Sequence, residues 1–153
     1  MNIDELVPDD AGEYYDGLRT ILSKIGDGYG KSIACDKGWY PLIISCDEEL
    51  TAICPNYEIL QIKEKFGTLR YYFYAPEECD CDRAKMNDVV NMYENLSAVT
   101  CEVTGGPGVL MGQTNDWFSW VKTLDPKLPG YDDWVILPKR EWIRPESNEE
   151  NNE

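Results

Sequence analysis

The sequence predicts an α+β fold in which a central antiparallel hairpin packs against three helices. Residues 58–65 and 68–75 are rich in branched and aromatic side chains and flank Phe66-Gly67, which is typical of two strands joined by a turn. Three other segments repeat apolar residues at helical spacing. A chain of 153 residues, 42% of them apolar, can bury one core. We therefore expect a single domain over residues 1–144 and a disordered acidic tail over 145–153.

The first helix is expected over residues 12–25. Asp9 and Asp10 precede it as capping candidates, and Gly26 follows its last apolar position. The apolar positions that recur at helical spacing are Tyr14, Leu18, Ile21, Leu22 and Ile25. The next segment, 26–38, contains four glycines but no phosphate-loop spacing, so it is interpreted as a plain loop.

The second helix is expected over residues 41–53, where Pro41 suits the first turn. One face is traced by Leu42, Ile43, Cys46, Leu50 and Ile53. This interpretation places Asp47, Glu48 and Glu49 together on the opposite, solvent-facing side.

The third helix is expected over residues 81–99. Its apolar stripe consists of Met86, Val89, Val90, Tyr93 and Leu96. Cys79 and Cys81 alternate with Asp80 and Asp82 just before it, a set that could ligate a metal. A C-x-C pair without a second chelating pair is a weak metal signal, however, and acids before a helix also serve as caps. The cap is the favoured interpretation.

The central hairpin is expected over about residues 57–75, extended by strands after residue 101. Because side chains alternate along a strand, Leu69, Tyr71 and Phe73 share one face, which we assign to the core. The other face carries Arg70, Tyr72 and Tyr74. Cations beside exposed aromatics could stack nucleic-acid bases, but the negative charge of the chain opposes direct nucleic-acid binding.

Acidity is the dominant feature of the composition, with 29 Asp and Glu against 14 Lys and Arg, no His, and a net charge of -15. The N-terminal acids are Asp4, Glu5, Asp9, Asp10, Glu13 and Asp16, without a base among them. Such a charge repels nucleic acid and anionic membranes and favours a basic protein partner. Ordinary solubility is the alternative explanation.

The six cysteines are expected to be reduced, because the N-terminus resembles no secretion signal and no stretch is apolar enough to span a membrane. A cytoplasmic location follows, in the host cytoplasm if the gene belongs to a phage. The sequence leaves open whether Cys79, Cys81 or Cys101 bind a metal or form disulfides.

Three runs of the sequence carry a resemblance to a known family. The runs GWYPLI, QIKEKFGTLRYYF and CEVTGGPG, the last with WVKTLD, resemble a family of small uncharacterised bacterial and phage proteins. The corresponding stretches there are W-Y-x-L, Q-x-K-E-K-F-G-x-L-R-F-Y and C-E-x-C-G-x-P-G. The resemblance covers roughly residues 38–125 and implies an architecture, without an assigned activity.

In that family C-E-x-C-G and a later cysteine in W-x-x-T-L-C resemble half of a zinc ribbon. Here Cys101 stands at the first position, but Thr104 and Asp125 occupy the others. A structural zinc site needs four nitrogen or sulfur ligands. The resemblance therefore implies that this metal site has been lost, and we expect neither a metal nor a cofactor.

The absence of histidine removes the usual base for nucleophilic or metal-water catalysis near neutral pH. Carboxylate pairs such as those within 47–49 or at Asp132 and Asp133 could still act as acid and base. Trp134 and Trp142 lie near acids, as in a protein-binding patch, although a strand closing over the core explains them equally well.

We expect a non-enzymatic interaction module that blocks a basic groove, on a nucleic-acid-binding host protein for example. A phage inhibitor of host defence of the anti-CRISPR or anti-restriction kind, imitating the charge of DNA, fits this description. The expected contact residues are the N-terminal acids, Asp47, Glu48, Glu49, Trp134 and Trp142. A toxin-neutralising immunity protein and a carboxylate-dependent enzyme are the alternatives.

Overall fold

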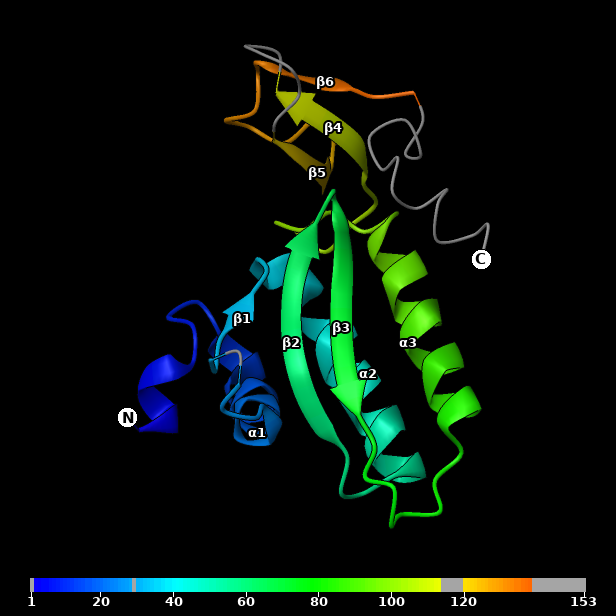
Figure 1. Ribbon diagram of the computed structural model, residues 1–153. Coiled ribbons are helices and arrows are strands. Elements are labelled where there is room, and N and C mark those ends of the chain that lie inside the picture. The colour runs from blue at the N-terminus through cyan, green and yellow to red at the C-terminus, as the bar shows by residue number, and fades with distance from the viewer. Residues whose placement is uncertain (1, 29, 114–119, 139–153) are drawn as a thin grey trace.

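The computed structural model describes residues 2–28, 30–113 and 120–138, and within them it confirms the α+β class (Figure 1). Its helices are α1 (Tyr15–Lys24), α2 (Tyr40–Ile53) and α3 (Arg83–Ser97), with short 3-10 turns at Ile3–Leu6, Gly12–Tyr14 and Lys37–Trp39. The strands are β1 (Ile33–Ala34), β2 (Glu58–Lys65), β3 (Thr68–Tyr74), β4 (Val109–Gln113), β5 (Val121–Leu124) and β6 (Trp134–Ile136).

The predicted hairpin is formed by β2 and β3, which pair from Lys65 and Thr68 at the turn to Glu58 and Tyr74 at the far end. Phe66 and Gly67 both have positive φ angles, 55° and 82°, as a two-residue hairpin turn requires. A third strand, β1, pairs in parallel with β2, so the strand order of this sheet is β1-β2-β3. β1 is not predicted from the sequence, because its two residues lie between glycines and carry no periodic signal.

In Figure 1, α2 crosses behind the β2–β3 hairpin, α3 runs alongside β3, and α1 lies toward the β1 side of the sheet. α2 contacts both α1 and α3, and α3 also contacts β3. The core between these layers contains Trp39, Ile43, Leu69 and Tyr71, each no more than 2% exposed. The prediction that this face of β3 points into the core is therefore confirmed for Leu69 and Tyr71, whereas Phe73 is half-buried beside the core.

The strands after residue 101 form a second sheet, of order β5-β4-β6, and do not extend the hairpin as one expectation had it. At the joint between the two sheets, Trp39 Nε1 donates to the carbonyl oxygen of Thr100 at 2.9 Å, and the Gly38 N–H donates to the carbonyl oxygen of Glu102 at 2.7 Å. A side chain at Gly38 would collide with the Cys101 carbonyl oxygen, so the close approach requires glycine.

Two parts of the sequence analysis lie outside the described residues, namely the tail over 145–153 and Trp142. The described helices include none with the length and apolar character needed to cross a membrane.

Candidate functional site

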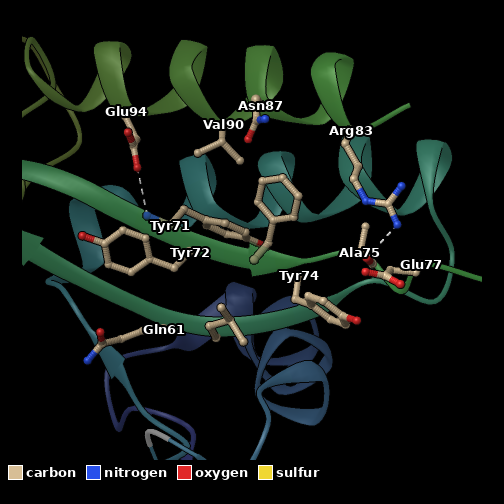
Figure 2. Close-up of a pocket in the computed structure, with 12 residues that line it drawn as sticks. Gln61, Tyr71, Tyr72, Tyr74, Ala75, Glu77, Arg83, Asn87, Val90 and Glu94 are labelled. Carbon is tan, nitrogen blue, oxygen red and sulfur yellow. Dashed lines mark hydrogen bonds between the residues drawn. The ribbon is translucent and has the colours of Figure 1, made fainter. Parts of the chain in front are cut away.

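A groove with a volume of about 750 Å³ lies between β3 and α3. β3 supplies its floor from Tyr71 to Tyr74, and α3 supplies Asn87, Val90 and Glu94 from above (Figure 2). The remaining lining residues are Leu60, Gln61, Ala75, Glu77 and Arg83. Val90, which belongs to the apolar stripe predicted for α3, thus faces the hairpin, and Asn87 lies at the rim of the groove.

The groove exposes one edge of β3 because this strand is the last in its sheet. Two of its outward-facing N–H groups are already bound by α3: Leu69 donates to Ser97 Oγ at 2.9 Å, and Tyr71 donates to Glu94 Oε2 at 3.0 Å. Outward-facing groups recur at every second residue in an antiparallel pair. The next donor of this series is the Phe73 N–H, within the groove.

Charged side chains close both ends of this edge. Arg83 donates to the carbonyl oxygens of Ala75 at 2.9 Å and Pro76 at 2.6 Å. At the other end, burial raises the pKa of Glu94, against the opposing effects of the Tyr71 N–H and the Arg70 charge. Between these ends the groove offers apolar and aromatic walls beside an open strand edge, which is what an extended peptide requires.

Asp47 is not on a solvent-facing surface, and that expectation is wrong. Its side chain is buried among Lys24, whose Nζ lies 2.7 Å from Oδ1, and Tyr57, whose hydroxyl donates to the same oxygen at 2.5 Å. The Lys24 ammonium also donates to Thr51 Oγ1 at 2.7 Å. The cause is helical geometry, because Asp47 stands four residues after the buried Ile43 on the face that packs against α1.

A second tyrosine extends this buried cluster. The hydroxyls of Tyr57 and Tyr71 lie 2.6 Å apart, and since Tyr57 donates to Asp47, Tyr71 donates to Tyr57. Burial raises the pKa of both tyrosines, and the hydrogen bond to Asp47 adds to the effect on Tyr57. These groups are fully engaged with one another, so the arrangement is suited to holding α1, α2 and the hairpin together.

Glu48 and Glu49 are exposed, as predicted, but the three acids do not form one surface. Consecutive helical residues point about 100° apart. Glu49 accepts a hydrogen bond from Tyr93 of α3, whereas Asp47 faces α1. A single partner surface could therefore contact Glu48 directly but could not engage all three.

The N-terminal acids are all exposed, as the sequence predicts. Asp4 is paired with Arg19, whose Nε lies 2.6 Å from Oδ1, and this hydrogen bond lowers the pKa of Asp4. Asp10 accepts a hydrogen bond from the Tyr40 hydroxyl at 2.8 Å. The other four, Glu5, Asp9, Glu13 and Asp16, make no salt bridge with any residue that the structure describes.

Trp134 is half-buried and packs edge-on against Tyr131, with ring centroids 5.4 Å apart. It belongs to a small cluster with Cys101, Met111 and Leu124. Of the two explanations considered for this tryptophan, packing in the second sheet is the one that the contacts favour. Asp132 and Asp133 beside it are exposed.

The cap predicted before α3 is confirmed, because Asp82 accepts a hydrogen bond from the Lys85 N–H at 3.0 Å. The same loop brings Cys79 and Cys81 next to Cys54 at the end of α2, and Cys54 and Cys81 are bonded as a disulfide. The expectation of fully reduced thiols is therefore wrong for this pair. The pairing could not be predicted from the spacing of the cysteines, because Cys54 lies 27 residues before Cys81.

Cys101 is fully buried at the joint of the two sheets. Burial opposes ionisation of its thiol, but hydrogen bonds from Thr104 and from the backbone of Asp125 and Val103 outweigh it, so its pKa is lowered. The Thr104 N–H lies 3.4 Å from the sulfur. Thr104 and Asp125 thus lie beside Cys101, where the resemblance would place further zinc ligands.

Comparisons with models of protein families, with curated proteins and with solved structures give no match. No enzyme family is identified for this chain by these comparisons.

Proposed function

We propose that the protein is a non-enzymatic interaction module that binds a basic surface of a partner protein and blocks it. The observation that carries this proposal is the set of exposed N-terminal carboxylates Glu5, Asp9, Glu13 and Asp16, unpaired within the described residues of a chain with a net charge of -15. Exposed like charges that are not neutralised internally attract a basic partner over long range.

The partner class follows from the same chemistry. A groove lined by Lys and Arg binds nucleic acid mainly through the charge of the phosphate backbone, and a row of carboxylates can occupy it instead. An inhibitor of a host defence nuclease, of the anti-CRISPR or anti-restriction kind, would work in this way. An immunity protein that neutralises a basic toxin would use the same surface, and the identity of the partner separates the two.

The chemistry of the two other candidate regions supports a binding role over catalysis. The lining of the groove contains no serine, threonine, cysteine or lysine, and the chain has no histidine. Asp47, the buried member of the acid group on α2, is bonded to Lys24 and Tyr57. These contacts support a structural role for this carboxylate.

The test compares two variants with equal changes in net charge. One reverses Glu5, Asp9, Glu13 and Asp16 to Lys, and the control reverses four exposed acids elsewhere, Asp27, Glu78, Asp88 and Asp132. A partner recovered from lysate is identified, purified and titrated against each variant by calorimetry at low and high salt. We expect binding that weakens with salt and with the N-terminal reversals far more than with the control. Equal losses in both variants would contradict the proposed surface.

The open edge of β3 favours a second candidate function, the capture of an extended segment of the same basic partner. Such a segment would pair with β3 beside Phe73 and lie against Val90, while Glu77 and Glu94 at the groove favour basic side chains. Only the stretch between Glu94 and Arg83 is open, so the paired segment would be short.

A matched pair of substitutions on α3 tests the groove. Asn87→Trp places a bulky ring at the rim, whereas Asn95→Trp changes the same residue type on another side of the helix. We expect only Asn87→Trp to weaken binding, and we expect the Phe73 amide to exchange its hydrogen more slowly in the complex. Unchanged exchange at Phe73, or equal losses from both tryptophans, would rule out strand pairing here.

A further inference from the structure

The structure gathers three of the six cysteines at one place, although they come from two separate segments. Cys54 follows the last residue of α2, and its N–H caps that helix by donating to the Leu50 carbonyl oxygen at 2.8 Å. Cys79 and Cys81 come from the loop that precedes α3. Their three sulfur atoms all lie within 4.8 Å of one another.

We propose that Cys54, Cys79 and Cys81 form a three-thiolate site for a soft metal ion such as Zn²⁺ when the chain is reduced. Three sulfurs that each bind one ion at about 2.3 Å lie roughly 3.8 Å apart in a tetrahedral arrangement. In the structure the three sulfurs lie within 4.8 Å of one another, and once the bond between Cys54 and Cys81 is reduced these two sulfurs move apart to reach this spacing. Three protein ligands leave one coordination position for water or another ligand, as in open zinc sites.

The surroundings of the thiols favour a cation. The loop around them reads EECDCD, so Glu77, Glu78, Asp80 and Asp82 raise the local concentration of cations. The start of α3 follows immediately, and the N-terminus of a helix stabilises thiolates. Cys54 is fully buried and Cys79 and Cys81 are half-buried, so an ion would be shielded on the side of the core and reachable from the loop.

The disulfide between Cys54 and Cys81 is the competing state of the same residues, because a sulfur bonded to another sulfur is no longer a thiolate ligand. In that state Cys79 remains a free thiol next to the bond. A reducing compartment keeps accessible thiols unpaired, and there the metal-bound state prevails. The site is independent of the proposed partner surface and of Cys101.

The first experiment titrates the full chain, reduced with a phosphine and freed of metal by a chelator, with Cd²⁺ while thiolate-to-metal charge-transfer absorption is followed. We expect saturation at one equivalent, competition by Zn²⁺, and an affinity loss of about tenfold or more in Cys79→Ser. Cys35→Ser, another half-buried loop cysteine, is the matched control and should bind like the parent, as should Cys101→Ser.

Cys54→Ser changes a buried residue and could unfold the chain, so the decision rests on Cys79→Ser, with circular dichroism to show that it is folded. Absence of charge-transfer absorption in the parent, or parental affinity in folded Cys79→Ser, would overturn the proposal.

A second experiment counts thiols after equilibration in a glutathione buffer of cytosolic potential, followed by unfolding and labelling. Six reactive thiols per chain would support an available metal site. Four would show that the disulfide persists and would overturn it.

Discussion

Asp47→Ala should destabilise the protein by about 3 kcal/mol, because it leaves the ammonium of Lys24 partly buried without its carboxylate. Breaking a buried ion pair by removing one partner costs about 3–5 kcal/mol. The Lys24 side chain keeps 20% of its surface exposed and retains Thr51 as a partner, so the lower end of this range applies. For a chain of this length, that loss lowers the melting temperature by about 6–12 °C.

Urea unfolding followed by tryptophan fluorescence measures the effect, with Glu48→Ala as the control from the next position of α2. Glu48 is exposed, so its removal should change stability by less than about 0.5 kcal/mol. The double variant Lys24→Met with Asp47→Leu should lose less than the sum of its single variants, since neither charge is then left alone. A loss below about 1 kcal/mol in Asp47→Ala, or strict additivity in the double variant, would refute the argument.

Three further predictions concern the joint, the groove and the hairpin. Gly38→Ala should destabilise by more than about 1 kcal/mol through a backbone collision, whereas Gly28→Ala, which has open space around it, should be nearly neutral by thermal unfolding. Burial raises the pKa of Glu94, so the protonated carboxyl is the form that the fold favours, and the stability it contributes at low pH is lost as the pH rises. In denaturant titrations, Glu94→Gln should therefore be more stable than the parent above about pH 4.3. Leu69→Ala should cost about 2–5 kcal/mol and the exposed Tyr72→Ala under about 1 kcal/mol; similar losses would contradict the face assignment.

The hairpin and the helices could be predicted because their signals are local. Branched and aromatic residues on both sides of Phe66-Gly67 specify a two-residue turn with positive φ, and the structure has that turn. The stripe on α3 likewise follows from spacing alone, with Met86, Val90 and Tyr93 buried. In such segments the residues adjacent in sequence determine the secondary structure.

The errors concern residues whose environment is set by distant parts of the chain. The helical pattern of residues 41–53 predicts Asp47 on the solvent-facing side, and nothing near it in the sequence indicates Lys24 and Tyr57 as its partners. Cys54 and Cys81 meet only because α2 ends beside the start of α3. A buried polar residue or a cysteine cluster is therefore the hardest feature to infer from one sequence, although the stripe position of Asp47 was a signal that could have been used.

Polar contacts around Glu102 hold the joint between the two sheets. Glu102 is 1% exposed, accepts a hydrogen bond from the Asp36 N–H at 3.0 Å, and lies 3.3 Å from the Lys122 ammonium of β5. Burial raises the pKa of Glu102, which marks the cost of placing this charge inside, and Lys122 opposes that shift.

Next to this carboxylate, burial opposes ionisation of the Cys101 thiol, but hydrogen bonds from the Thr104 side chain and from backbone N–H groups outweigh it and lower the pKa. These donors favour negative charge on the sulfur, and the joint is also held by Glu102 and by the close contact of Gly38. Thr104 and the backbone of Asp125 supply some of these donors, so both residues contribute to the order of the joint.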